Sequence, residues 1–207
     1  MSAPRHIVDS LESVLSLYFS NCLHKERAAF ILCDELVEVT CRDRVKQTVP
    51  RAAAAQLTFP DLLTHPVVGL NIITSGLGRA VNECHRARND MQHNNPAATV
   101  DPRYCADAVI DAVEVIEHCF PGTKSALPDR LKVTIRVVRL LSRQGDQRQQ
   151  TEFGNAMQAH QWRGDRERAK REEVIVAPGP RANWGLVIPS EFARVEGLLD
   201  RVGVPPF

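Results

Sequence analysis

Residues 101–122 constrain the fold more than any other part of the chain. Asp101 is followed by Pro102, a pair typical of a helix start, because aspartate caps free amides and proline fits the first helical position. Apolar residues then recur at the spacing of one helical face, namely Tyr104, Ala108, Val109, Ala112, Val113, Ile116 and Phe120. Pro121-Gly122 ends the run. The sequence therefore predicts an amphipathic helix over residues 101–120.

The same periodicity predicts further helices on both sides of this segment. They are expected at residues 6–21, from residue 25 to a point before Pro50, near 52–55, from Thr58 through a capped first turn, over 67–93, and from 127 to about 141. Residues 132–137 also alternate in the manner of a strand, but the wider pattern favours a helix. Asn94-Asn95-Pro96 is expected to end the helix over 67–93, because the residue before a proline avoids helical geometry.

Composition supports the same fold class. Of the 207 residues, 43% are hydrophobic, which is enough for a packed core, but only 5% are aromatic. A core built mainly from Leu, Val, Ile and Ala favours packed helices over a sheet sandwich. The predicted fold is mainly α, an antiparallel helical bundle with a small C-terminal appendage.

The composition changes after Gly145. Residues 130–171 hold 11 Lys or Arg against 4 Asp or Glu, which makes this the one local basic region. Two short strands are predicted at 173–177 and 184–188, forming a hairpin, and a last helix is predicted over 189–201. We therefore expect a helical domain over 1–145, and a basic helical segment with a small strand and helix unit over 146–207.

Several classes of site and location are disfavoured. The formal net charge is +1, so no overall basic field indicates a nucleic-acid partner. The six cysteines show neither zinc nor Cys-x-x-Cys redox spacing, and no glycine loop of a cofactor-binding type is present, so no metal and no cofactor are expected. No apolar run approaches the length of a membrane span, and no signal peptide precedes the first helix. These features predict a cytoplasmic, reduced protein that does not bind a membrane.

The residue pattern richest in chemistry is the segment Arg88-Asn89-Asp90-Met91-Gln92-His93. Arginine is charged at every physiological pH, whereas histidine gains or loses a proton near neutrality. A guanidinium group grips a phosphate with two hydrogen bonds, and an imidazole can move the proton. The segment therefore predicts phosphate chemistry.

Two segments together resemble the HEPN family of helical domains. Residues 25–38, Lys-Glu-Arg-Ala-Ala-Phe-Ile-Leu-Cys-Asp-Glu-Leu-Val-Glu, resemble its first long helix, and Arg88, a polar residue and then His93 resemble the motif of a later helix. The resemblance covers about residues 6–122. It implies a HEPN-like bundle that dimerises, so that two Arg-His pairs face one cleft. Some family members carry a tyrosine two residues after the histidine as a target of a cognate antitoxin, but this chain has Asn95 there.

Active members of that family are metal-independent endoribonucleases, often in toxin–antitoxin or antiviral defence systems. The resemblance therefore implies an RNA substrate such as tRNA or mRNA, a homodimer, and a cognate inhibitor or defence-system partner. RNA carries its own nucleophile, the 2′-hydroxyl. In this reading His93 acts as general base or acid, Arg88 stabilises the charge on the phosphate, and Asn89 binds a phosphate oxygen or orients His93. The products expected are a 2′,3′-cyclic phosphate and a 5′-hydroxyl.

Helix geometry sets a condition on this site, and a simpler reading stays open. Five residues of ideal helix rotate by about 140°, so Arg88 and His93 meet only if the helix ends or distorts near His93, or if a second subunit supplies one of them. Alternatively, both residues belong to a solvated helix end, where cations favour the free carbonyls. The chain is then a non-catalytic HEPN-like dimerisation module that binds a partner protein or nucleic acid.

Overall fold

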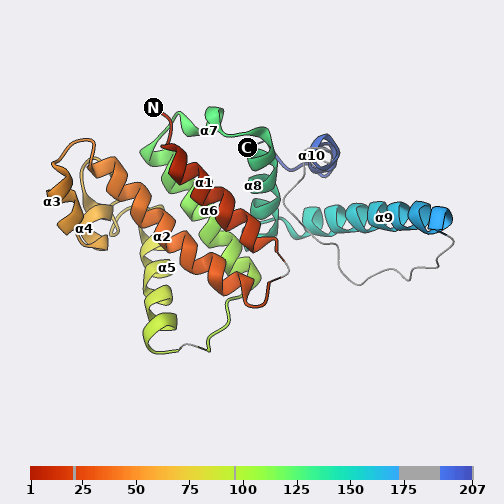
Figure 1. Cartoon of the computed structure of the whole chain (residues 1–207), viewed down its shortest axis with the longest axis horizontal. Coiled ribbons are helices and arrows are strands. Elements are labelled where there is room, and N and C mark those ends of the chain that lie inside the picture. Colours follow the sequence, from red (N-terminus) through yellow and green to blue (C-terminus); the bar gives the residue numbers. More distant parts are fainter. Residues whose placement is uncertain (21, 96, 173–191, 207) are drawn as a thin grey trace.

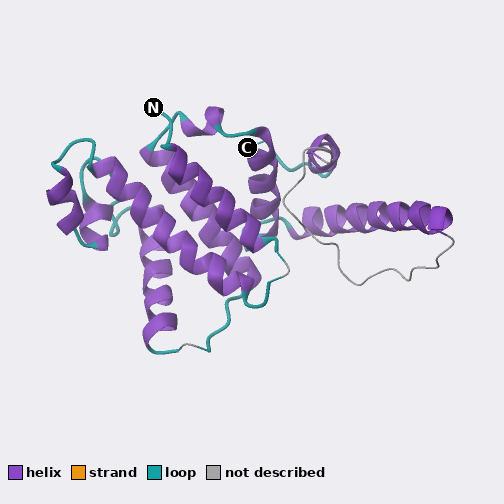
Figure 2. Cartoon of the chain, viewed as in Figure 1, coloured by secondary structure: helices purple, strands orange, loops and turns teal. Residues whose placement is uncertain are grey.

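The fold of the chain was obtained as a computed structural model that describes residues 1–20, 22–95, 97–172 and 192–206 (Figure 1). Helices make up most of these residues, and the same residues contain no strand (Figure 2). The predicted mainly α fold class is confirmed. The predicted hairpin at 173–177 and 184–188 lies outside the described residues.

Five helices form the body of the molecule: α1 (Arg5–Tyr18), α2 (Lys25–Val45), α5 (Gly76–His93), α6 (Pro102–Cys119) and α8 (Asp129–Leu141). Three short helices connect them: α3 (Arg51–Gln56), α4 (Phe59–Thr64) and α7 (Thr123–Ala126). The chain continues into α9 (Gln147–Glu172), which leads away from the body in Figure 1, and α10 (Phe192–Arg201).

Side-chain contacts show that consecutive long helices run in opposite directions. His6, near the start of α1, lies 2.7 Å from the carboxylate of Asp43, near the end of α2. Arg27, at the start of α2, donates a hydrogen bond to the carbonyl oxygen of Met91, near the end of α5. The chain therefore returns along α5 before it enters α6, so α2 and α6 run in the same direction.

The α6 helix lies at the centre of the bundle, as its apolar pattern predicts. Its N-terminus is capped by Asp101, whose side chain accepts hydrogen bonds from the backbone amides of Arg103 and Tyr104 at 2.8 and 3.1 Å. The helix packs against α2 and α5 and also contacts α1 and α8 (Figure 1). Its buried apolar residues are Cys105, Ala106, Ala108, Val109, Ile110, Ala112, Val113, Val115, Ile116 and Cys119. Burial of these side chains joins the helices through one hydrophobic core.

The helix predicted over residues 67–93 is wrong in its first part, because α5 begins only at Gly76. Gly69 has a φ of 69°, a left-handed conformation that interrupts a helix. The turn is held in place by His118 of α6, whose Nε2 lies 2.7 Å from the carbonyl oxygen of Val68. The helix starts after Ser75, whose hydroxyl accepts a hydrogen bond from a backbone amide of the first turn.

Two local predictions are confirmed. Residues 129–141 form a helix, α8, rather than a strand. Thr58 caps α4 as the sequence suggests: its hydroxyl accepts from the amide of Asp61, and the Asp61 carboxylate accepts from the Thr58 amide in return.

The C-terminal residues 192–206 pack against α8 through a buried cation. Arg136 is only 4% exposed, and its guanidinium lies 2.7 Å from the carboxylate of Asp200 in α10. It also donates to the carbonyl oxygens of Val204 and Pro205. A division at residue 145 stays a prediction, but residues from both sides of it share the hydrophobic core.

A search of the described residues found no helix that combines the length and the apolar character needed to cross a lipid bilayer.

We expect Gly145→Ala to destabilise the protein, because a methyl group at this position overlaps the carbonyl oxygen of Leu140 in the turn between α8 and α9. Backbone has to shift, at a cost of about 1–3 kcal/mol in the free energy of unfolding. Gly154→Ala is the matched control, since nothing lies near the added methyl group inside α9, and alanine there favours the helix by up to about 1 kcal/mol. Urea unfolding of the two variants is expected to give shifts of opposite sign. Equal shifts contradict the tight turn.

Candidate functional site

Four polar side chains that contact one another lie where α5 packs against α2. His85, Arg88 and Asn89 stand three and four positions apart on α5, so they occupy one face of that helix. The α2 helix presents Asp34 to this face, and the Asp34 side chain is 1% exposed. A carboxylate with so little access to water requires compensating donors, and α5 supplies them.

Asp34 is approached by two donors from α5. Nδ1 of His85 lies 3.0 Å from both carboxylate oxygens. Nε of Arg88 lies 3.4 Å from Oδ2, which is close enough for an ion pair, but the N–H is not aligned for a hydrogen bond and has no other acceptor. The Arg88 side chain is 25% exposed, so its guanidinium spans the boundary between the buried carboxylate and solvent.

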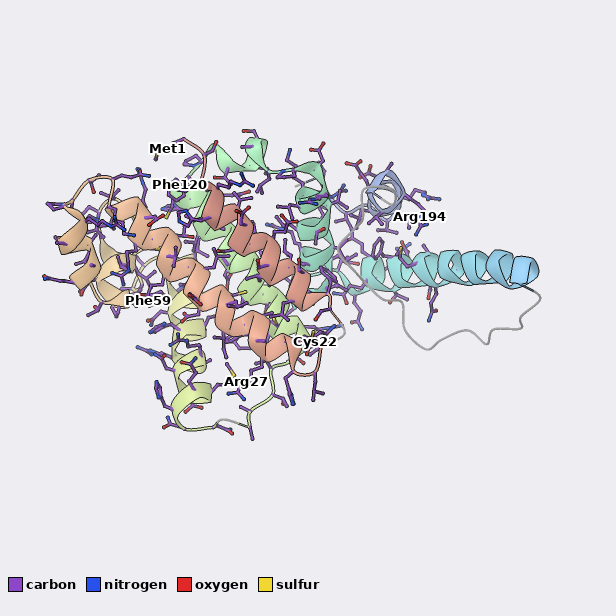
Figure 3. The ribbon with its side chains drawn as sticks, in the orientation of Figure 1. Met1, Cys22, Arg27, Phe59, Phe120 and Arg194 are labelled. Atoms are coloured by element: carbon purple, nitrogen blue, oxygen red, sulfur yellow. The ribbon has the colours of Figure 1, made fainter. Side chains whose placement is uncertain are left out.

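Asn89 links the other ends of the same two side chains. Its amide nitrogen lies 3.1 Å from Nε2 of His85, and its carbonyl oxygen accepts a hydrogen bond of 2.9 Å from NH1 of Arg88. The imidazole of His85 also stacks on the ring of Phe59 from α4, with ring centres 4.0 Å apart. Figure 3 shows Phe59 near the N-terminal part of α5 and Arg27 beside its C-terminal part. We call Asp34, His85, Arg88 and Asn89 the Asp34 network.

His93, the third residue predicted for the site, does not belong to this network. It is the last residue of α5 and is exposed, and its side chain makes neither a hydrogen bond nor an ion pair with any residue that the structure describes. The helix ends at His93, as the Asn94-Asn95-Pro96 sequence predicts, but it stays helical up to that residue, so His93 remains about 140° around the helix from Arg88. The reason is local: Asn94 keeps helical geometry and its amide closes the last turn on Asp90.

Two residues of the Asp34 network were not predicted from the sequence. Asp34 stands among the apolar positions Cys33 and Val37 of α2, and a carboxylate inside such a stripe is a sign of a buried partner. His85 precedes Arg88 and Asn89 by one helical turn, which indicates a shared face. Neither signal identifies the partner, because helix packing decides which residues of α5 meet α2.

Burial raises the pKa of the Asp34 carboxyl, and the adjacent His85 and Arg88 act in the opposite direction. Two opposing effects of this kind are typical of a buried acid whose ionised form depends on its donors. Removal of either donor is therefore expected to favour the protonated carboxyl.

A second acid, the partly buried Asp111 of α6, lies close to Asp34. Burial raises the pKa of Asp111 to about 7, and the nearby carboxylates of Glu114 and Asp107 add to the effect. Asp34 and Asp111 both line a small, largely apolar cavity between α2, α5 and α6, with Cys33 and Cys84 in its wall. Among the residues that the structure describes, no three side chains of the metal-binding types gather into one set.

No family model matches the chain, and neither a curated protein nor a solved structure is significantly similar to it.

We expect Asp111→Asn to stabilise the protein in a manner that depends on pH. The folded-state pKa of about 7 lies above the ordinary value of 3.8, so ionisation of Asp111 costs stability. The cost is absent below about pH 4 and complete above about pH 7, where it reaches an upper limit of about 4 kcal/mol. Thermal melts are expected to coincide near pH 4 and to favour the variant at pH 8.

The matched control for this prediction is Asp129→Asn on α8, where the carboxylate is 75% exposed. Its melting temperature is expected to differ from wild type by little at either pH, since exposed ion pairs contribute less than about 1 kcal/mol. A gain at pH 8 that is equal for both variants contradicts a specific cost of burying Asp111.

Proposed function

We propose that the chain is a homodimeric, metal-independent endoribonuclease of the HEPN type, in which Arg88 binds the scissile phosphate and His93 transfers protons. The observation that carries the proposal is the anchoring of Arg88. An ion pair to buried Asp34 and a hydrogen bond to Asn89 fix this cation at a partly exposed position of α5. A guanidinium held in one orientation is suited to a phosphate, because less rotamer entropy is lost when the two oxygens bind.

The reaction needs only proton transfer and stabilisation of negative charge. His93 removes the proton from the 2′-hydroxyl or donates one to the leaving 5′-oxygen, and its exposed imidazole is accessible to a polymer. Arg88 stabilises the charge that develops on the non-bridging oxygens. Asn89 orients Arg88 through its carbonyl oxygen. The 2′-oxygen bonds to phosphorus while the bond from phosphorus to the 5′-oxygen breaks, which leaves a 2′,3′-cyclic phosphate on one product and a 5′-hydroxyl on the other.

The proposed site is shared between two subunits. Arg88 and His93 are separated by about 140° around a continuous α5, so Arg88 of one copy acts with His93 of the second copy. In Figure 1 the last turns of α5 extend beyond the other helices, and residues 92–95 are exposed. This end of α5 is therefore accessible to a second copy of the chain and to RNA.

The finer features of the proposal follow the HEPN resemblance. Residues 6–122 form the HEPN-like unit, and the C-terminal appendage includes a hairpin. The RNA substrate is tRNA or mRNA in the cytoplasm, and an inhibitor or defence-system protein is the regulatory partner.

The test is cleavage of tRNA and mRNA in the presence of EDTA. We expect wild-type protein to cleave and both Arg88→Ala and His93→Ala to lose activity by about 10²-fold or more, because each removes one essential part of the reaction. Arg86→Ala is the matched control, since Arg86 is an exposed arginine on the same helix, and it is expected to retain cleavage. Cleavage that persists in both site variants, or that EDTA abolishes, contradicts the proposal.

Mixing the two inactive variants tests whether the site is shared. A dimer that contains one Arg88→Ala chain and one His93→Ala chain has one intact combination of Arg88 and His93. Statistical mixing is therefore expected to restore about a quarter of the wild-type activity for a two-fold symmetric dimer. Formation of the mixed dimer is verified by its mass. If activity does not recover although mixed dimers have formed, the result contradicts a site formed by two subunits.

A non-catalytic interaction module is the second candidate, and one observation favours it. Arg88 already contacts two side chains inside its own chain, and His93 lies on another face of α5. In that case Arg88 serves to join α5 to α2, and the protein binds a partner without cutting RNA. Wild-type protein that binds RNA or a protein partner but shows no EDTA-resistant cleavage supports this second function.

A further inference from the structure

The direction of the hydrogen bonds in the Asp34 network is set by Arg88. A guanidinium only donates, so Asn89 must present its carbonyl oxygen to NH1 of Arg88, 2.9 Å away. The Asn89 amide nitrogen, which also only donates, then faces Nε2 of His85 at 3.1 Å. Nε2 therefore carries no proton. The proton of the neutral imidazole lies on Nδ1, which donates to Asp34.

A second proton on His85 is incompatible with this arrangement. Protonation of Nε2 places its N–H opposite the N–H groups of Asn89, and the contact becomes repulsive. Asn89 can accept from Nε2 only after its amide turns over, and its nitrogen then faces the donors of Arg88. The hydrogen bond between Arg88 and Asn89 and a proton on Nε2 of His85 therefore exclude each other.

We propose that Arg88, Asn89 and His85 form a phosphate-binding site in which binding is coupled to protonation of His85. This inference rests on the phosphate-binding role of Arg88 in the proposed function, but it does not require cleavage. A phosphate accepts the NH1 donor of Arg88, so Asn89 is released and its amide turns. Its carbonyl oxygen then accepts from the newly protonated Nε2, and its nitrogen becomes available to the phosphate. Phosphate binding is therefore accompanied by uptake of a proton from solvent by the fraction of His85 that was neutral.

The geometry of Arg88 is compatible with this exchange. Its side chain is 25% exposed, and Nε, although buried, has no aligned acceptor. The guanidinium therefore makes only one well-formed hydrogen bond with the other described residues of the network, the one to Asn89. A phosphate replaces that bond with a stronger charge-assisted one.

The carboxylates around His85 also favour its protonation. On α2, Asp34 favours the protonated imidazole, and Glu38 lies near enough to raise the pKa of Asp34. From α6, Asp111 lines the same small cavity as Asp34, and from α4 the uncharged ring of Phe59 stacks on the imidazole. Arg88 on α5, which pairs with Asp34, disfavours a second positive charge here. A phosphate bound to Arg88 offsets this repulsion.

The coupling works in both directions. Phosphate binding is expected to move the titration of His85 to higher pH, and a lower pH is expected to strengthen phosphate binding. Coupling between two sites is typically 5- to 150-fold, so we expect about a tenfold rise in affinity between pH 8 and pH 6.

The experiment uses a short 2′-O-methyl RNA oligonucleotide, whose blocked 2′ position prevents cleavage, and histidine labelled with ¹⁵N. The His85 signal is the one that His85→Gln removes. In free wild-type protein near pH 7.5 we expect neutral His85 with its proton on Nδ1, as the hydrogen-bond directions require. On saturation with the oligonucleotide, the midpoint of its titration is expected to rise by about one pH unit, which corresponds to the tenfold coupling.

The matched variant is Asn89→Ala, which removes the amide but leaves Arg88 and Asp34 in place. We expect this variant to bind the oligonucleotide. On binding, the midpoint of its His85 titration is expected to rise by less than half as much as in wild type, since only the direct effect of the phosphate charge persists. Asn89→Ser serves the same purpose if the alanine variant does not fold. Arg88→Ala is expected to lose both binding and shift, whereas Arg86→Ala retains both.

The outcomes separate this inference from the proposed function. One outcome is that binding depends on Arg88 but the His85 titration midpoint shifts equally in wild type and Asn89→Ala. This outcome overturns the coupling and leaves the phosphate-binding role of Arg88 intact. A free His85 with its proton on Nε2 also overturns the coupling, and this measurement needs no variant. Binding that is absent, or that persists in Arg88→Ala, overturns both.

Discussion

The buried carboxylate of Asp34 is the interaction on which the arrangement of α2 and α5 depends. Its side chain is 1% exposed, and its two described donors, His85 and Arg88, both come from α5, so the two helices meet at one charge rather than along an apolar seam alone. Removal of a partner from a buried charge is typically far more costly than loss of an exposed ion pair. The same contact that fixes the helices therefore also fixes the orientation of Arg88. Stability and the candidate site are linked at this point of the fold.

Helices whose signals are local could be predicted from the sequence. Asp101 and Pro102 mark the start of α6 because capping depends on neighbours in the chain, and the apolar stripe that follows predicts the central position of that helix. The start of α5 was missed because the segment before it has an apolar pattern of helical spacing. The turn there is set by the left-handed Gly69 and by a contact of His118 from α6, fifty positions away. Tertiary contacts of that kind leave no signal in a local pattern.

The candidate site was predictable only in part, for the same reason. Arg88 and Asn89 attract attention because their residue types suit phosphate chemistry, whereas Asp34 and His85 become important only once α5 lies on α2. His93 illustrates the opposite case: its spacing from Arg88 resembles a family motif, but the continuous helix turns the two side chains to different faces. A motif states which residues are present. Their convergence depends on helix geometry and, in the proposed function, on a second copy of the chain.

A guanidinium that binds both a buried acid and an external phosphate has to satisfy two demands. The internal contact must be strong enough to hold the side chain in place, and weak enough to release donors to a ligand. The Asp34 network meets the two demands with two different contacts. Asp34 supplies an ion pair that is not aligned as a hydrogen bond, and Asn89 supplies a hydrogen bond that a phosphate can replace. Replacement of one hydrogen bond by another costs little, because the guanidinium is neither desolvated again nor reoriented. In the proposed phosphate-bound state, the proton on His85 then stabilises the released Asn89. The phosphate itself does not contact His85.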